Sequence, residues 1–405
     1  MHIDLSMAQT AALASVFLVV GKLIKDRVPV LSRYFIPTPI VGGVLFALLT
    51  LYGYQSGNFT LELDDALREF LLIAFFTTVG FSASFSLLKK GGMAVVLLLV
   101  AAVILMLVQN ITGVALATLL GEQPLLGVAA GSVSLTGGHG TSAAFAPELE
   151  RLGVVGALPA AMAASTWGLV AGCIIGGPVG SRLLRKYKIQ KPSHEAYQAE
   201  LQREQLAQQE DKPELAPEGK TFDLSMYSVN LLALCMGVGS VLVLLLKQKG
   251  IIIPSYLGAM LFAAIVRNFI DWRGYKYPVK EMETIGSVSL AFFLVIALMS
   301  MKLWELASVA GPLLIILIVQ TAIVFLFAYF VTFRLMGKDY DAAVIATGHC
   351  GFGLGATPNA MANIQSFTDA NGPSPKAFFV IPIVGSLFID FFNALTIMGF
   401  IALLK

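Results

Sequence analysis

One polar, glycine-rich segment interrupts an otherwise apolar chain. Residues 131–147 read GSVSLTGGHGTSAAFAP and contain three glycines in four positions, His139 and several hydroxyl side chains. A second segment of this kind, residues 347–363, reads TGHCGFGLGATPNAMAN. Irregular backbone persists at membrane depth only where protein or a water-filled cavity satisfies its polar groups. We therefore expect both segments to be buried in protein and to form a binding site.

The residue types in these segments suit two kinds of ligand. Glycine lets the backbone approach a ligand closely, and free amide N–H groups at the start of a helix bind anions. Freed carbonyls, hydroxyls and amide oxygens suit a hard cation such as Na⁺. The residues predicted to bind substrate are Ser132, Ser134, Thr136, Gly137, Gly138, His139, Gly140, Thr141, Gly353, Gly355, Thr357, Asn359 and Asp390. The residues predicted to bind Na⁺ are Thr141, Ser142, Asn110, Thr357, Asn363, Asp390 and Asn393. Tight helix packing by small residues is the alternative explanation of the glycines, but it is weaker for two segments than for one.

Asp390 lies deep within a predicted span. A carboxylate in the bilayer core costs about 2.5–3.5 kcal/mol, so its side chain should face the protein interior and have a partner. It could accept a substrate ammonium group, ligate a cation or carry a proton. It could equally anchor a neighbouring hairpin. Asn393 follows three residues later on the same helix face.

Other polar side chains within predicted spans have both structural and functional interpretations. Amides there often hold helices together, which is our prediction for Gln320, whereas Gln109 and Asn110 could also be ligands. Histidine can be a pH-sensitive element or a hydrogen-bond donor. His139, inside the glycine run, fits a functional role as well as a structural one; His349, which precedes its run, favours a structural role.

The composition predicts an all-α polytopic membrane protein. Hydrophobic residues make up 57% of the 405 residues and charged residues only 13%, against about a quarter charged in soluble domains. The basic residues are spread over short loops, which gives no sign of nucleic-acid binding. The three cysteines lie in apolar stretches and do not predict a disulfide framework.

Ten segments are apolar and long enough to be read as spans. The predicted spans are 7–24, 38–53, 69–88, 93–120, 154–181, 223–246, 252–270, 284–301, 308–334 and 374–403. The two glycine-rich segments fall between the fourth and fifth spans of each set of five. They are too short and polar to cross, so we predict re-entrant hairpins at about 125–147 and 341–363.

Loop charges predict the orientation in the membrane, because Lys and Arg are enriched in cytoplasmic loops. The basic loops are those at 22–33, 89–90, 182–191, 267–280 and 334–338. They predict periplasmic N- and C-termini and a cytoplasmic centre. Lys247, Lys249 and Lys302 fall outside and weaken this bias without reversing it.

The two halves of the chain resemble each other on either side of a polar linker at 182–222. VGGVLFA at 41–47 matches LGAMLFA at 257–263, and GTSAA at 140–144 matches ATPNA at 356–360 at the same spacing. Because each half, 1–181 and 223–405, has an odd number of spans, the second must be inverted relative to the first. Inverted repeats with broken segments at matching positions indicate a secondary transporter with a midplane site. We expect the hairpin tips to meet there, with Thr141 close to Thr357.

Several long motifs resemble the bacterial sodium/glutamate symporters. They are TGGHGTSAAFAP (136–147), FIPTPIVGG (35–43), MKLWELAS (301–308) and GKDYDAAVIATGHCGFGLGATPNAMANIQ (337–365). The resemblance implies Na⁺-coupled uptake of L-glutamate across the bacterial cytoplasmic (inner) membrane, with Na⁺ as the co-transported ion and no organic cofactor. It also implies a homodimer in the lipid bilayer in which a transport domain slides past a scaffold, an elevator mechanism.

Other classes fit the residues less well. An intramembrane aspartyl protease needs two deep carboxylates and only Asp390 is placed so; no HExxH metal motif is present. A passive channel would more often repeat by oligomer symmetry around a pore. Within transporters, the alternative is proton-coupled transport of glutamate or another small carboxylate, because Asp390, His139 and His349 could titrate. The hairpins are richer in neutral oxygens than in titratable groups, which favours Na⁺.

Overall fold

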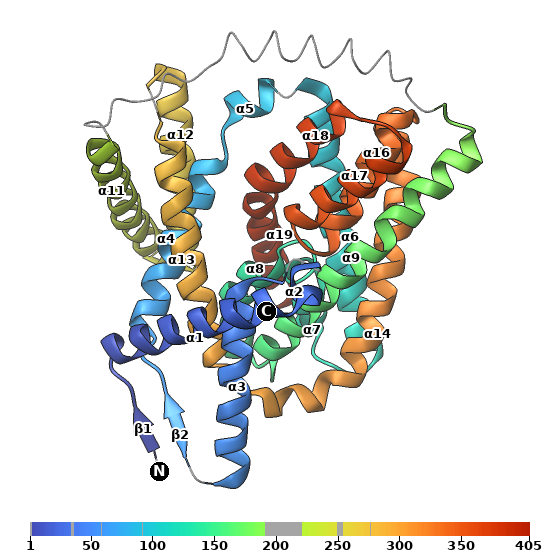
Figure 1. Ribbon diagram of the computed structural model, residues 1–405. Helices are drawn as coiled ribbons and strands as arrows, with labels where there is room; N and C mark the ends of the chain where they lie inside the picture. Colours follow the sequence, from blue (N-terminus) through green and yellow to red (C-terminus); the bar gives the residue numbers. More distant parts are fainter. Residues whose placement is uncertain are drawn as a thin grey trace.

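The computed structural model describes residues 2–33, 36–57, 59–90, 92–190, 221–248, 254–275 and 277–405 (Figure 1). Helices dominate these residues. The helices of the first half are α1 (Met7–Arg27), α2 (Pro29–Arg33), α3 (Thr38–Ser56), α4 (Ala66–Ser82), α5 (Phe85–Lys90), α6 (Gly92–Leu119), α7 (Pro124–Val128), the π-helix η1 (Ala129–Val133), α8 (Gly138–Arg151) and α9 (Ala157–Tyr187). Most of the predicted linker, residues 191–220, lies outside the described residues.

The second half has a similar succession of helices. They are α11 (Thr221–Gln248), α12 (Ser255–Arg273), α13 (Val279–Met299), α14 (Leu303–Phe327), η3 (Ala328–Thr332), α15 (Phe333–Leu335), α16 (Tyr340–Leu354), α17 (Thr357–Asn371), α18 (Pro375–Pro382), η4 (Ile383–Phe388) and α19 (Ile389–Leu404). Among the described residues, eight helices or runs of helices are long and apolar enough to cross a membrane. The protein is therefore a polytopic membrane protein.

Two features depart from the predicted succession of helices. The predicted span at 69–88 is broken at Ala83, where the backbone leaves the helical region (φ −77°, ψ 73°), so α4 and α5 are separate helices. A short parallel ladder joins β1 (His2–Asp4) to β2 (Thr60–Glu62), so the chain is not entirely helical. Three-residue strands carry too little periodicity to be recognised in a sequence.

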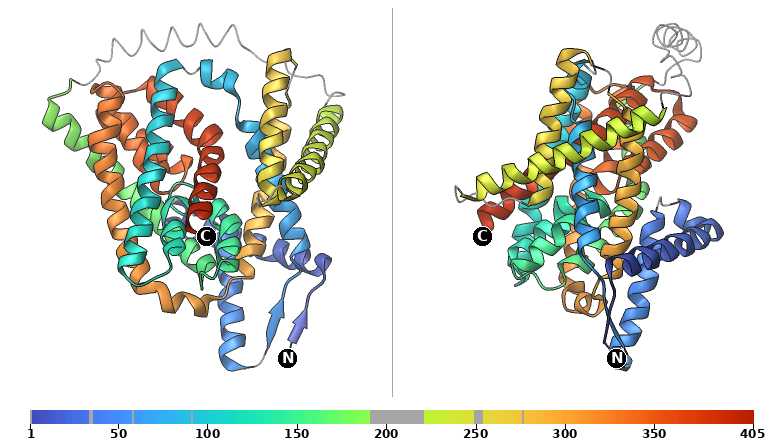
Figure 2. Two further views of the ribbon diagram at one scale, coloured as in Figure 1. Left: turned by 180° about the vertical axis from the view of Figure 1, so that it is seen from behind. Right: turned by 90° about the vertical axis from the view of Figure 1, so that its left-hand side faces the viewer.

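The helices form two groups that lie side by side (Figures 1 and 2). One group contains α1, α3, α4, α11, α12 and α13; the other contains α6 to α9 and α14 to α19. The short helix α5 runs between the groups at one end of the molecule. A large buried core cluster includes side chains of both groups, among them Phe76 of α4 and Phe145 of α8.

A stripe of glycines on α9 lets this helix approach α16 and α17 closely. A Cβ at Gly168 would lie 1.8 Å from the Leu354 carbonyl oxygen, and one at Gly176 would lie 2.4 Å from the Asn363 amide. Glycines four residues apart share one helix face and allow backbones to touch, as small residues do between membrane helices. The stripe therefore fixes α9 against the second glycine-rich segment.

Each glycine-rich segment is a pair of helices joined by a short irregular turn. We call Pro124–Arg151 the first hairpin and Tyr340–Asn371 the second hairpin. Both extend further than the predicted 125–147 and 341–363, chiefly because the second helix of each pair continues beyond the polar motif. The turns lie at residues 134–137 and 355–356, and each contains one glycine and is flanked by further glycines in the adjoining helices.

Candidate functional site

A cavity of about 670 Å³ lies where the two hairpins meet. Its other walls come from α3, α4, α9, α13, η4 and α19. The predicted site residues that line it are Thr136, Gly137, Gly138, His139, Gly140, Thr141, Gly355, Thr357 and Asp390. Residues separated by more than two hundred positions in the sequence thus line the same cavity, and Thr141 and Thr357 are both among them.

The two hairpin turns are in direct contact. Gly138 has a positive φ of 65°, and a Cβ at this position would lie 3.1 Å from the carbonyl oxygen of Gly355. Residues other than glycine rarely adopt this backbone conformation. Glycine at 138 therefore serves both the turn of the first hairpin and its close approach to the second.

Gln109 of α6 connects the two turns. Its amide nitrogen donates to the Gly353 carbonyl at 2.7 Å, and its amide oxygen accepts from the Thr136 hydroxyl at 2.7 Å. Gln320 of α14 in turn donates to the Gln109 carbonyl at 2.6 Å. All of these groups are buried, so Gln109 and Gln320 hold helices together. Gly353 lies behind the cavity wall and does not line it.

The break in the first hairpin is held by two asparagines. At Gly131 the backbone leaves the helical conformation (φ −99°, ψ −129°). Asn110 accepts from the Ser132 backbone N–H at 2.8 Å, and Asn393 donates to the Ser132 carbonyl at 2.9 Å. Buried backbone groups must be paired, and these side chains do so where the helix does not. Asn110, Ser132 and Asn393 do not line the cavity.

The second hairpin is held to α9 by its own asparagines. Asn359 donates to the Leu169 carbonyl at 2.7 Å, and Asn363 donates to the Gly172 carbonyl at 2.9 Å. Both acceptors lie on α9, one of them in its glycine stripe. Asn359 and Asn363 lie outside the cavity lining and anchor α17.

Ser134 and Ser142, also absent from the cavity lining, belong to a buried group of oxygens between the first hairpin and α9. The Ser142 hydroxyl lies 2.9 Å from that of Ser165 and 3.3 Å from that of Ser134. All three serines are at most 1% exposed. The predicted Na⁺ ligands thus fall into separate places: the cavity wall, the hairpin anchors and this serine group.

The two histidines differ in what they face. His139 lines the cavity, and its Nε2 pairs with the Thr166 hydroxyl at 3.0 Å. His349 lies in the core, where its Nδ1 pairs with the Thr332 hydroxyl at 2.8 Å and its ring stacks on Phe352. Of the two, only His139 could touch a solute in the cavity.

Asp390 lies at the start of α19, after the π-helix η4, and lines the cavity together with Ser386. A second cavity of about 360 Å³ shares Asp390, Ser386, Ser287, Leu290 and Phe75 with the first. Ser386 precedes Asp390 by four residues, and this helical spacing was the signal that could have identified it. Ser287 and Leu290 of α13 carry no comparable sequence signal.

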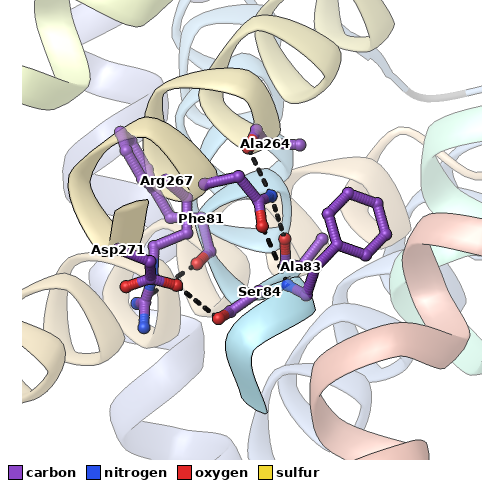
Figure 3. Close-up of polar contacts among 8 residues, drawn as sticks. Phe81, Ala83, Ser84, Ala264, Arg267 and Asp271 are labelled. Atoms are coloured by element: carbon purple, nitrogen blue, oxygen red, sulfur yellow. Dashed lines mark hydrogen bonds and ion pairs between the residues drawn. The ribbon is translucent and has the colours of Figure 1, made fainter. Parts of the chain in front are cut away.

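The second cavity extends to Arg267, which we predicted to lie in a basic loop and which instead lies buried within α12. Arg267 of α12 is 7% exposed and pairs with Asp271 at 3.1 Å, and its guanidinium lies over the Tyr277 ring. Burial raises the pKa of the Tyr277 phenol, which therefore stays neutral. Asp271 also accepts from the Ser84 hydroxyl, at the break between α4 and α5 (Figure 3).

Asn268 completes this contact between α12 and the α4–α5 break. It accepts from the Phe85 backbone N–H at 2.8 Å and donates to the Ala83 carbonyl at 2.8 Å. Side chains of α12 thus satisfy backbone groups that the break leaves without helical partners, and so stabilise the division of the predicted span.

A cavity at the meeting point of two broken helical pairs, with hydroxyl, imidazole and carboxyl groups in its lining, lies within a bundle of apolar, membrane-length helices. This arrangement defines a membrane transporter of small solutes. The chain belongs to the sodium/glutamate symporter family, whose model matches residues 3–373. A sodium/glutamate symporter of Escherichia coli (strain K12) is 40% identical over 99% of this chain and 98% of its own length. One of Haemophilus influenzae is 41% identical over 97% and 96%, respectively. These relatives are named as symporters, so the chain is a transporter and not an enzyme.

Proposed function

We propose that the protein couples the uptake of L-glutamate to the entry of Na⁺ across the bacterial cytoplasmic membrane, and that the cavity between the hairpins is the glutamate site. Family membership supports the solute and the ion. The observation that carries the site is the convergence of both glycine-rich turns on one cavity, whose lining includes His139, Thr141 and Asp390. Such a cavity suits a small amino acid better than a macromolecule.

The cavity offers a partner for each charged group of glutamate. Backbone N–H groups and hydroxyls near the turns, with Thr141 and Thr357, can donate to the carboxylates, and α17 begins at Thr357 with its positive dipole end toward the cavity. Asp390 can accept from the ammonium group. We assign Thr136, His139 and the cavity-lining glycines to the same site. Gln109, Asn110, Asn359, Asn363 and Asn393 support its shape.

The two halves of the protein are proposed to be inverted repeats, with re-entrant hairpins. Matching glycines support this reading: a Cβ at Gly42 would clash with the α1 backbone at Phe17, and one at Gly258 would clash with the α11 backbone at Gly239. The group containing α11 and α12 would be the scaffold, and the group containing both hairpins would move as the transport domain. Alternating exposure of the cavity by such sliding is the proposed elevator mechanism, in a homodimer.

Uptake into proteoliposomes tests this function. We expect labelled L-glutamate to accumulate when an inward Na⁺ gradient is imposed, and not when K⁺ replaces Na⁺. Flux that only equilibrates glutamate, with or without the gradient, would indicate a channel. Accumulation driven by a pH gradient in Na⁺-free buffer would replace Na⁺ with H⁺ as the coupling ion, a role for which Asp390 is the available carboxyl group at the cavity wall.

A further inference from the structure

A group of buried oxygens behind the cavity makes more close oxygen–oxygen contacts than its hydroxyl hydrogens can serve as hydrogen bonds. The hydroxyls of Ser134, Ser142 and Ser165 make six oxygen–oxygen contacts among themselves and with carbonyls. The carbonyls in these contacts belong to Ala129, Val133, Ser134 and Ala161. Each hydroxyl supplies one hydrogen, so three hydrogens serve six contacts.

Ser142 shows this shortage most clearly. Its hydroxyl lies 2.9 Å from Ser165 Oγ, 3.3 Å from Ser134 Oγ, and 3.4 Å from the carbonyl oxygens of both Val133 and Ala161. One hydrogen cannot serve all four neighbours, so oxygen lone pairs in this group remain free to bind a cation.

The spacing of these oxygens fits a small hard cation. Oxygen ligands lie about 2.3–2.6 Å from Ca²⁺, an ion close in size to Na⁺, so neighbouring ligands at right angles are roughly 3.3–3.7 Å apart by the same geometry. The three longer contacts of Ser142 are 3.3–3.4 Å. Val133 and Ser134 also end the first helical arm of the hairpin, and carbonyls at such half-helix ends coordinate Na⁺ in transporters.

We propose that this serine group is a Na⁺ site, separate from the glutamate cavity. Its ligands are the hydroxyls of Ser134, Ser142 and Ser165 and the carbonyl oxygens of Val133 and Ala161. This inference rests on the proposed function, because it names the place of the coupling ion. No carboxylate belongs to this set, so the bound ion keeps its positive charge.

The position of the site provides a means of coupling. Its ligands come from the first arm of the first hairpin, from α8 and from α9, so a bound ion holds three elements together. Ser142 directly follows Thr141, which lines the glutamate cavity. The ion therefore fixes the cavity wall and adds positive charge behind it, and both effects favour binding of an anionic substrate.

Thermal unfolding of the purified full-length protein in detergent tests the site directly. The wild type should gain stability with rising NaCl relative to equal KCl, because a ligand that binds only the folded state raises Tm. Ser165→Ala and Ser142→Ala should lose this Na⁺-dependent gain. Ser228→Ala, which removes another fully buried hydroxyl from α11, is the matched control and should retain it.

Uptake at varied Na⁺ concentration gives the second measurement. Ser165→Ala should raise the Na⁺ concentration for half-maximal uptake by at least about tenfold, since even indirect partners of metal ligands contribute that much. If the wild type lacked Na⁺-dependent uptake, the proposed function itself would fail. If the wild type showed it and both serine variants kept the wild-type Na⁺ response in unfolding and uptake, the site would be wrong and the function would stand. A Tm lowered equally in NaCl and KCl, with an unchanged Na⁺ response, would also overturn the site.

Discussion

At the scale of single residues, the cavity separates side chains that can meet a solute from side chains that hold the hairpins. Thr141, Thr357 and Asp390 line it, whereas Asn110 and Asn393 are engaged with the Ser132 backbone. Residue type alone cannot make this distinction, because asparagine is both a good ligand and a good partner for a broken helix.

Thr141→Val tests the cavity wall. The substitution keeps the shape and removes the hydroxyl, so a hydrogen bond to a charged substrate group is lost. Such a bond contributes about 1.5–3 kcal/mol, so we expect the apparent KM for glutamate to rise by about tenfold or more with unchanged expression. Initial uptake rates at varied glutamate provide the measurement. Unchanged kinetics would remove Thr141 from the site.

Asp390→Asn tests whether the charge is used. The amide keeps the size of the side chain but can neither neutralise an ammonium group nor carry a proton. We expect Na⁺-driven glutamate accumulation to fall to background while the protein still folds. Normal transport together with a lowered Tm would instead make Asp390 a structural anchor. Uptake and thermal unfolding measured on one preparation distinguish the two outcomes.

At the scale of elements, both hairpins depend on close backbone contacts with neighbouring helices. The glycine stripe of α9 brings the second hairpin against it, and Gly138 brings the two turns together. Broken helices leave backbone groups without partners, and the amides of Gln109, Asn110 and Asn393 supply them. The site is thus positioned by helices distant in sequence.

Gly168→Ala tests the glycine stripe, with Gly177→Ala as its control. A Cβ at Gly168 would lie 1.8 Å from the Leu354 carbonyl oxygen, whereas one at Gly177 would meet nothing within 4 Å. Overpacking of this kind costs about 1–3 kcal/mol, so Gly168→Ala should lower Tm by several degrees and reduce uptake. Gly177→Ala should leave both unchanged. Equal effects of the two variants would refute close packing as the cause.

At the scale of the whole molecule, the helices form two groups, and both groups contribute walls to the cavity. Phe75 and Leu290 belong to α4 and α13, and Thr141 and Asp390 belong to the other group. A shift of one group past the other would therefore change the cavity's surroundings on one side only. This is the structural basis on which we propose an elevator mechanism.

Alkaline phosphatase fusions test the orientation of the whole chain. The enzyme is active only when exported, so a fusion after Lys405 should be active and a fusion after Lys188 should be inactive. The reason is the bias of Lys and Arg toward the cytoplasmic side. Phosphatase activity in whole cells, normalised to fusion protein, provides the measurement. The reverse pattern would invert the predicted topology and make both termini cytoplasmic.

Hydropathy and the positions of the glycines were enough to predict, from the sequence by itself, that the protein is a polytopic membrane protein and where most of its helices lie. Apolar stretches predicted where helices occur, because a helix in lipid must bury its backbone polar groups within itself. The polar interruptions at 131–147 and 347–363 likewise led us to predict a hairpin in each half. These are local properties, and the sequence expresses them over tens of consecutive residues.

Only the tertiary structure decided which polar residues share a space. It brought Thr136 to Gln109, put Ser142 beside Ser165, and buried Arg267 next to Asp271. The reason is that membrane helices associate through packing and hydrogen bonds between residues far apart in the chain. No local periodicity records which helix faces which, so the partners of a polar side chain become known only when the helices are assembled.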